Sequence, residues 1–180
     1  EDNDGIEDAK EGTAVVVTKG SAAAVQIGSA TANASIGPVA GASAAGHGIV
    51  INGSILGDGA YKDVQGNGLV IGGLGGTVSV AGGVTVNGSV AANSNGANAT
   101  AIRLGTGATV PTLKNTGSVT ATGGSGATSV VRAITVDAGA NLASITNSGR
   151  ISAAAAVDGT AIAIADNSGT LSLVTNSGTI

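Results

Sequence analysis

Side chains able to do acid–base or nucleophilic chemistry are few and far apart. His47 is the only histidine in the 180 residues, and the chain has no cysteine. His47 lies in a Gly/Ala-rich loop without an acid close by in sequence, and no Gly-x-Ser-x-Gly motif accompanies it. A Ser-His-Asp triad needs such partners, and metal centres draw on several His or Cys ligands. We therefore expect a protein that is not an enzyme, with no catalytic residue, metal site or cofactor.

Aspartates are the remaining candidates for chemistry. Asp58 and Asp63 stand five residues apart in one polar loop, a spacing that could place two carboxylates on either side of a glycosidic bond. Asp137, Asp158 and Asp166 are dispersed along the chain. The simpler interpretation is that Asp58 and Asp63 belong to a polar loop. Hydrolysis of a peptide, ester or glycan that depends on His47 or on Asp58 and Asp63 would contradict the expectation of a non-catalytic protein.

Most of the negative charge lies in the first twelve residues. Six of the eleven acids fall there: Glu1, Asp2, Asp4, Glu7, Asp8 and Glu11. We expect residues 1–12 to be a solvated, disordered lead. Calcium binding is the alternative, although the Asp-Asn-Asp-Gly run lacks the spacing and distal Glu of an EF-hand. The rest of the chain has no basic stripe, which argues against nucleic acid as a partner.

A short phrase, apolar–x–Asn-Ser-Gly–x–apolar, recurs along the chain and organises it. It ends the sequence at residues 174–180 and occurs earlier at 145–151 and, with Thr in place of Ser, at 113–119; shortened copies lie at 86–90 and 51–55. A period near 30 residues indicates a repeat architecture. We assign the asparagines to one corner position, where stacked amides form a ladder; a ligand-binding role for the row is the alternative. The ladder residues are Asn52, Asn87, Asn115, Asn147 and Asn176.

Between these phrases the sequence predicts short strands. Apolar residues alternate with small or polar ones in runs such as 101–104 and 133–136, and Gly or Asp-Gly breaks separate the runs. Three strands per repeat, each stacked on its equivalent in the next copy, give a parallel β-helix. We predict an all-β fold in which residues 13–180 form one parallel β-helix of about six three-strand coils, a rod of roughly 30 Å.

Composition fits thin repeated layers. Met, Trp and Phe are absent, Tyr61 is the single aromatic residue, and only 10% of residues are charged. The sequence contains no apolar run of about 20 residues and no visible signal peptide. Because it stops partway through a repeat without a cap, we expect it to be a piece of a longer protein.

The phrases in residues 48–180 resemble passenger repeats of bacterial autotransporters, the type V secreted proteins of Gram-negative bacteria. Two runs carry the resemblance, at 101–119 and 142–151, together with Ser-Gly-Thr-Leu-Ser-Leu-Val-Thr-Asn-Ser-Gly-Thr-Ile at 168–180. The resemblance implies a right-handed β-helix at the cell surface or outside the cell, exported through a translocator barrel in the parent chain. Many such passengers act in adhesion, autoaggregation and biofilm formation.

Two hypotheses about function follow. The first is a non-catalytic adhesin that binds a surface glycan or protein of a host or bacterial cell. The second is a structural stalk or filament subunit that self-associates by stacking uncapped coils end to end. A third reading, an ice-binding solenoid, would need regular threonine ladders, and Thr120 and Thr122 have no threonine equivalents in the repeats around Ala91 and Ala153.

Overall fold

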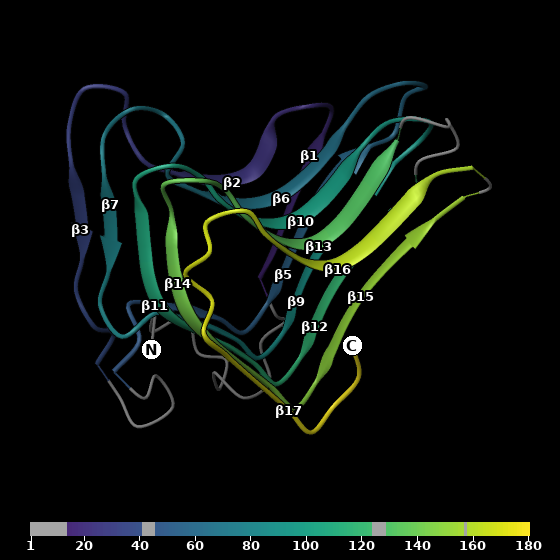
Figure 1. The fold of residues 1–180 in the computed structure, drawn as a ribbon. Helices are drawn as coiled ribbons and strands as arrows, with labels where there is room; N and C mark the ends of the chain where they lie inside the picture. Colours follow the sequence, from purple (N-terminus) through teal and green to yellow (C-terminus); the bar gives the residue numbers. More distant parts are fainter. Residues whose placement is uncertain (1–13, 41–45, 124–128, 157) are drawn as a thin grey trace, which may run out of the picture.

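The chain folds into a β-solenoid with three parallel sheets. The computed structural model describes residues 14–40, 46–123, 129–156 and 158–180, and these contain strands and turns without a helix. Viewed along the solenoid axis, the chain passes in turn through three sheets around a common core (Figure 1). We call these sheets A, B and C, in the order in which the chain enters them. The predicted acidic lead, its calcium alternative and the boundary at residues 12–13 lie outside the described residues.

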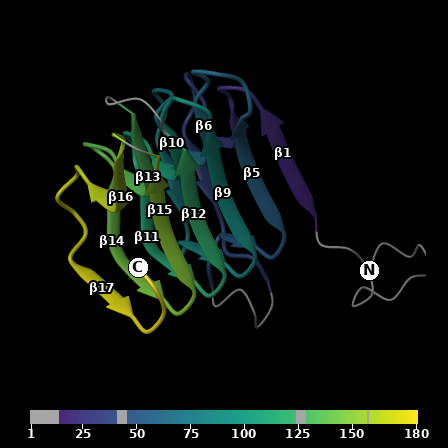
Figure 2. The ribbon, with the colours of Figure 1, turned by 90° about the vertical axis from the view of Figure 1, so that its right-hand side faces the viewer.

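The strands of sheets A and B are single segments repeated in every coil. Sheet A contains β1 (Val15–Lys19), β5 (Ser54–Gly59), β9 (Ser89–Ser94), β12 (Ser118–Gly123) and β15 (Arg150–Ala155), which lie side by side in Figure 2. Sheet B contains β2 (Ala23–Ile27), β6 (Gly66–Ile71), β10 (Ala99–Leu104), β13 (Val130–Val136) and β16 (Thr160–Asp166).

Sheet C is more irregular. It contains β3 (Ala34–Ile36), β4 (Ile49–Ile51), β7 (Val78–Val80), β8 (Val84–Val86), β11 (Ala108–Asn115), β14 (Asn141–Asn147) and β17 (Leu173–Asn176). The long strand β11 pairs with both β7 and β8, at Ala108 and Leu113 respectively. In each of the first two coils, therefore, two short strands occupy the place that a single long strand has in the later coils.

This division corrects the predicted coil number. Each of sheets A and B has five strands, and the stack makes about four turns of about 32 residues rather than six coils. The short strands β3 and β4 belong to one coil, so the extra strand-like segments before Gly57 lengthen that coil without adding a layer. Four steps of about 4.8 Å give a stack of roughly 20 Å instead of the predicted 30 Å.

Matched columns of aliphatic side chains build the core. Val90, Val119 and Ile151 are in register on neighbouring strands of sheet A, and all three are fully buried. Leu113 and Ile145 form a corresponding buried column in sheet C. Because each layer contributes similar aliphatic residues at the same height, the core is continuous without aromatic side chains.

Strands of sheet B change phase in the middle. In β10, the outward Thr100 is followed by two buried residues, Ala101 and Ile102, before Arg103 turns outward again. Strand β13 has the same two buried residues, Ala133 and Ile134, after Arg132, and its next residue, Thr135, is buried as well. A single strand alternates strictly, so two consecutive buried residues mark a local bend that re-aims the flanking side chains. Figure 1 shows the strands of sheet B curved along their length.

A concave polar face on sheet B

The residues first considered for catalysis are scattered and serve structural contacts. His47 is buried, and its Nδ1 lies 2.7 Å from Thr85 Oγ1. Asp58 pairs with Lys19 Nζ at 3.1 Å. Asp63 adopts a left-handed backbone with φ of 60°, as expected in a tight turn. None of these contacts joins His47 to an aspartate.

Asp166 also has a structural role. Its Oδ1 accepts hydrogen bonds from the Ser168 hydroxyl and from the backbone N–H groups of Ser168 and Gly169, and its Oδ2 accepts from Leu171 N–H. These bonds, led by that from the Ser168 hydroxyl, lower the pKa of Asp166, while burial opposes the shift. The carboxylate thereby closes the corner between β16 and the chain that leads to β17.

The predicted asparagine ladder divides into two columns that are offset by one residue. Asn115 is in register with Asn147 and, on its other side, with Val86 rather than Asn87. Asn115 Nδ2 donates to Asn147 Oδ1 at 2.7 Å, and Asn147 Nδ2 donates to Asn176 Oδ1 at 2.7 Å. Asn115 and Asn147 are buried, so this column is an internal one.

The other two asparagines stand outside. Asn87 Nδ2 donates to Asn52 Oδ1 at 2.9 Å, and both side chains are exposed. Above them the column continues with Thr116, whose hydroxyl donates to Asn87 Oδ1 at 2.9 Å. The inner column stops where the equivalent position becomes Val86. Within the part of the chain that the structure describes, the buried Asn115 Oδ1 is therefore left without a hydrogen-bond partner. The amides of both columns join successive turns of the stack by hydrogen bonds.

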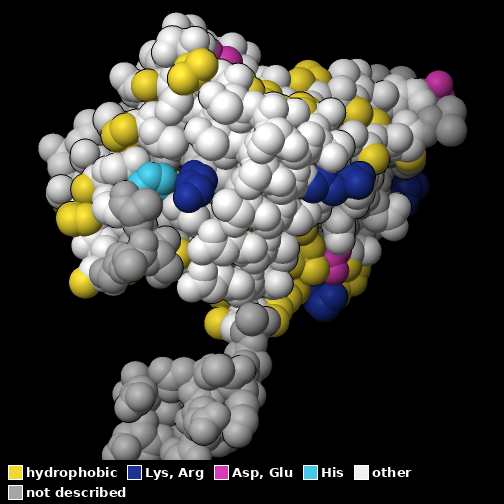
Figure 3. Space-filling view, turned by 90° about the horizontal axis from the view of Figure 1, so that it is seen from below, with side chains coloured by type: hydrophobic (Ala, Val, Ile, Leu, Met, Phe, Trp, Pro, Cys, Tyr) yellow, Lys and Arg dark blue, Asp and Glu magenta, His cyan; other side chains and the backbone are white. Residues whose placement is uncertain are grey.

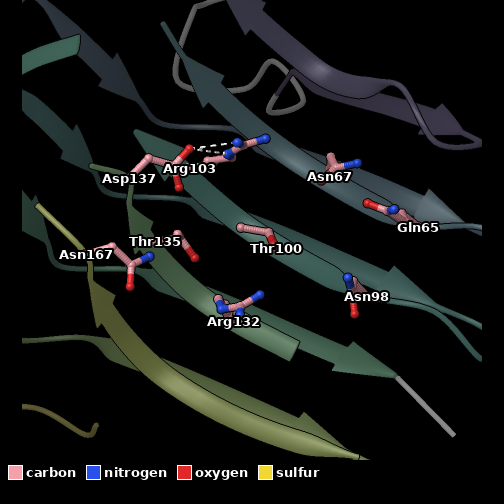
Figure 4. Close-up of a pocket in the computed structure, with 9 residues that line it drawn as sticks. All are labelled: Gln65, Asn67, Asn98, Thr100, Arg103, Arg132, Thr135, Asp137 and Asn167. Carbon is pink, nitrogen blue, oxygen red and sulfur yellow. Dashed lines mark hydrogen bonds and ion pairs between the residues drawn. The ribbon is translucent and has the colours of Figure 1, made fainter. Parts of the chain in front are cut away.

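A polar hollow of about 240 Å³ lies on the outer face of sheet B (Figure 4). We call it the sheet B hollow. Its uncharged lining comes from Gln65, Asn67, Asn98, Thr100, Thr135 and Asn167, and its charged lining from Arg103, Arg132 and Asp137. Eight of these residues belong to three successive strands, β6, β10 and β13, or to the segments beside them, and Asn167 follows β16. The hollow therefore runs across the strands.

Strand register and the mid-strand bend position these side chains. Asn67, Thr100 and Arg132 form one row across β6, β10 and β13. Arg103 and Thr135 form a second row on the other side of the bend. Because the bend separates the rows, outward side chains on its two sides converge over a concave surface.

The charges in the hollow are unequal. Arg103 Nη2 lies 2.7 Å from Asp137 Oδ2, and Arg103 Nε donates to the same oxygen at 2.7 Å. Arg132 is half-buried, and no carboxylate among the described residues forms an ion pair with it. The hollow therefore contains two guanidinium groups against one carboxylate, a net positive charge.

Thr135 has a buried hydroxyl group whose hydrogen bonds are not satisfied. It is 6% exposed, and although it lines the hollow its hydroxyl has no hydrogen-bond partner among the described residues. A buried hydroxyl without a partner costs free energy, about 1–3 kcal/mol in proteins. A ligand in the hollow that reached this hydroxyl would supply the missing hydrogen bond.

Sequence reasoning missed this face. From the sequence alone, the runs that contain Ala101-Ile102 and Ala133-Ile134 indicate only the alternation of core strands. The sequence does contain a signal for this face. In both repeats, two small or apolar residues follow one another and interrupt the two-residue alternation of a strand, and a polar residue stands on either side of the pair. That interruption identifies a bend, and the arginines are its outward neighbours.

Comparisons with protein-family models, with curated proteins and with solved structures give no match to this chain. Among the described residues, no group of His, Cys, Asp or Glu side chains could hold a metal ion. The same residues include no helix with the length and apolarity needed to cross a bilayer. The parallel β-solenoid fold is therefore the starting point for a proposal about function.

Proposed function

We propose that this chain is part of a surface-exposed β-helix passenger that acts in adhesion without catalysing a reaction. The observation that carries the proposal is the sheet B hollow, where strands from successive turns present amides, hydroxyls and guanidinium groups to solvent. Such groups bind polar ligands by hydrogen bonds and ion pairs. A repeated, rigid face of this kind suits attachment, because every added turn extends the same surface.

The finer parts of the proposal rest on the resemblance of residues 48–180 to autotransporter repeats. They are a right-handed winding, export through a translocator barrel in the parent chain, and a location on the outer membrane or outside the cell. The expected roles are adhesion to a host or bacterial surface, autoaggregation and biofilm formation. Much of the surface seen in Figure 3 consists of uncharged polar side chains and backbone, with few acids or bases.

Surface display tests this function directly. The chain is fused ahead of a translocator barrel in a Gram-negative host, and adhesion to cultured cells, settling of the bacterial suspension and biofilm mass are measured. We expect the fusion to reach the surface and to raise at least one of these readouts above the barrel alone. A fusion that is displayed and folded but changes none of them would overturn the proposal.

A stalk or filament subunit is the second candidate, and exposed apolar residues at both ends of the stack favour it. Val15, Val16 and Val17 of β1 are 64%, 41% and 46% exposed, and Leu173 and Val174 of β17 are 58% and 43% exposed. Edge strands of this kind template further pairing. Electron microscopy over a range of concentrations separates long uniform filaments from short single rods.

A further inference from the structure

The geometry points to the sheet B hollow as a binding site for an acidic saccharide, recognised through a sugar carboxylate. This inference rests on the proposed adhesive function and names the ligand class that the same face would take. Arg132 is its central residue. Its guanidinium lines the hollow and is not engaged by a carboxylate of the described residues.

The chemistry of the lining selects a carboxylate. A guanidinium group forms two parallel hydrogen bonds with a carboxylate, a geometry that a lysine ammonium cannot match. Arg103 already has a carboxylate partner in Asp137, whose Oδ2 lies 2.7 Å from both Nε and Nη2. Arg132 lies one strand along on the other side of the bend, so an incoming carboxylate would complete a second pair beside the first.

The uncharged lining selects a polyhydroxylated molecule. Asn98 Oδ1 is occupied by the backbone N–H of Val130 at 2.7 Å, and Asn67 Nδ2 by the carbonyl of Ser21 at 2.8 Å. Their remaining amide atoms can donate to or accept from sugar hydroxyls. The unpartnered hydroxyl of Thr135, at least nine-tenths buried, supplies a further hydrogen bond that the free protein lacks.

The shape favours a chain rather than a compact molecule. At about 240 Å³ the hollow is smaller than the roughly 300–1,000 Å³ of enclosed small-molecule pockets. It crosses β6, β10 and β13, so a ligand longer than one sugar unit would extend along the solenoid axis. The only aromatic residue, Tyr61, does not line it, so recognition would depend on ion pairs and hydrogen bonds instead of stacking on sugar rings.

The binding test uses the purified chain with two carboxylated probes, α-1,4-linked tetragalacturonate and sialyllactose. Their neutral counterparts are the methyl ester of the first and lactose for the second. Titration calorimetry gives affinity, and the ¹⁵N–¹H signal of Arg132 Nε reports contact at the site. We expect at least one carboxylated probe to bind and to shift this signal, with the neutral counterpart at least roughly tenfold weaker.

Three variants assign the binding to the hollow. Arg132→Gln should weaken the carboxylated probe at least roughly tenfold, and Thr135→Val should weaken it about threefold or more while the chain stays folded. Arg150→Gln is the matched control, because Arg150 is an exposed arginine on sheet A, hydrogen-bonded to Ser152, and its loss changes net charge equally. It should leave affinity within about twofold.

Several outcomes would overturn the site. They are no binding of either carboxylated probe at millimolar concentration, equal binding of the neutral counterpart, or the same loss from Arg132→Gln and Arg150→Gln. The display assay distinguishes a failure of the saccharide site from a failure of the proposed adhesive function. If Arg132→Gln adheres as well as the parent sequence, the site is wrong and adhesion stands; if the parent sequence itself does not adhere, the proposed function fails.

Discussion

Corner glycines set the spacing of the turns at the scale of single residues. A Cβ on Gly117 would lie 2.0 Å from the carbonyl oxygen of Gly88 in the turn below, and Gly88 and Gly149 show the same contact with their own neighbours. The coils approach so closely that only hydrogen fits at this position. We expect Gly117→Ala to cost about 2–4 kcal/mol of unfolding free energy, since backbone must move to admit a methyl group.

The matched control is Gly37→Ala. A Cβ there meets no atom of the described residues within 4 Å, and Gly37 does not have a left-handed φ. Denaturant unfolding should give a change within about 1 kcal/mol and of either sign. Equal losses at the two positions would show that close stacking at the corner does not determine the effect.

The buried and the exposed asparagine columns should contribute differently to the free energy of unfolding. Asn147 sits in the inner column, accepts from Asn115 and donates to Asn176, each at 2.7 Å. Asn147→Ala should cost about 2–3 kcal/mol, because a buried amide loses its partner. Asn87→Ala removes a comparable bond to Asn52 on the exposed column and should cost less than about 1 kcal/mol. Chemical denaturation of both variants tests this, and equal losses would contradict it.

Asp166 makes stability depend on pH in the acidic range. Its pKa in the folded chain lies below the usual 3.8, chiefly because the Ser168 hydroxyl donates to it. Its contribution to stability is therefore complete above the unfolded pKa and is lost as the pH falls through the lower folded pKa. The stability advantage of the parent sequence over Asp166→Asn should be largest near neutral pH and should shrink in acid. Thermal unfolding across pH measures it, and a constant difference would be evidence against this role.

At the scale of elements, position in the stack decides what a core residue contributes. Val16, Ile55, Val90, Val119 and Ile151 occupy one column of sheet A. Val119 is fully buried, whereas Val16 at the end of the column is 41% exposed. Val119→Ala should cost about 2 kcal/mol or more, and Val16→Ala less than about 1 kcal/mol. Urea midpoints of the two variants provide the measurement; equal shifts would mean that the end layer is as well covered as the middle.

The strands and their stacking also show which features of the fold could be predicted from the sequence. The repeated phrases predicted parallel stacking and three strands per coil, because period and alternation are visible in the residues themselves. Register was less accessible: Asn87 and Asn115 look equivalent in sequence, yet the stacked glycines align Asn115 with Val86. The coil number failed because β3 and β4 share one coil. The hollow was missed because curvature arises where alternation breaks, and only coordinates bring Arg103, Arg132 and Thr135 to one surface.

At the scale of the whole molecule, the solenoid has sides and ends with different chemistry. The sides are covered by polar ladders and by the sheet B hollow, whereas the end layers expose valines and leucine. Adhesion would use the sides, and filament formation would use the ends. A change confined to one region can therefore distinguish the two proposed functions in a single preparation.

Self-association through the ends makes the sharper prediction. Val16 ends an inward column, so Val16→Lys places a charge on the apolar end, a device by which natural edge strands resist pairing. If coils stack end to end, the parent protein should form longer assemblies as its concentration rises, as measured by sedimentation velocity and electron microscopy. The Val16→Lys variant should remain a single rod. Val39→Lys is the control: Val39 is 45% exposed but lies in the loop after β3, away from the column, so this variant should assemble like the parent. If the parent stays monomeric throughout, or both variants assemble alike, end-to-end stacking is ruled out and the side face is the functional surface to pursue.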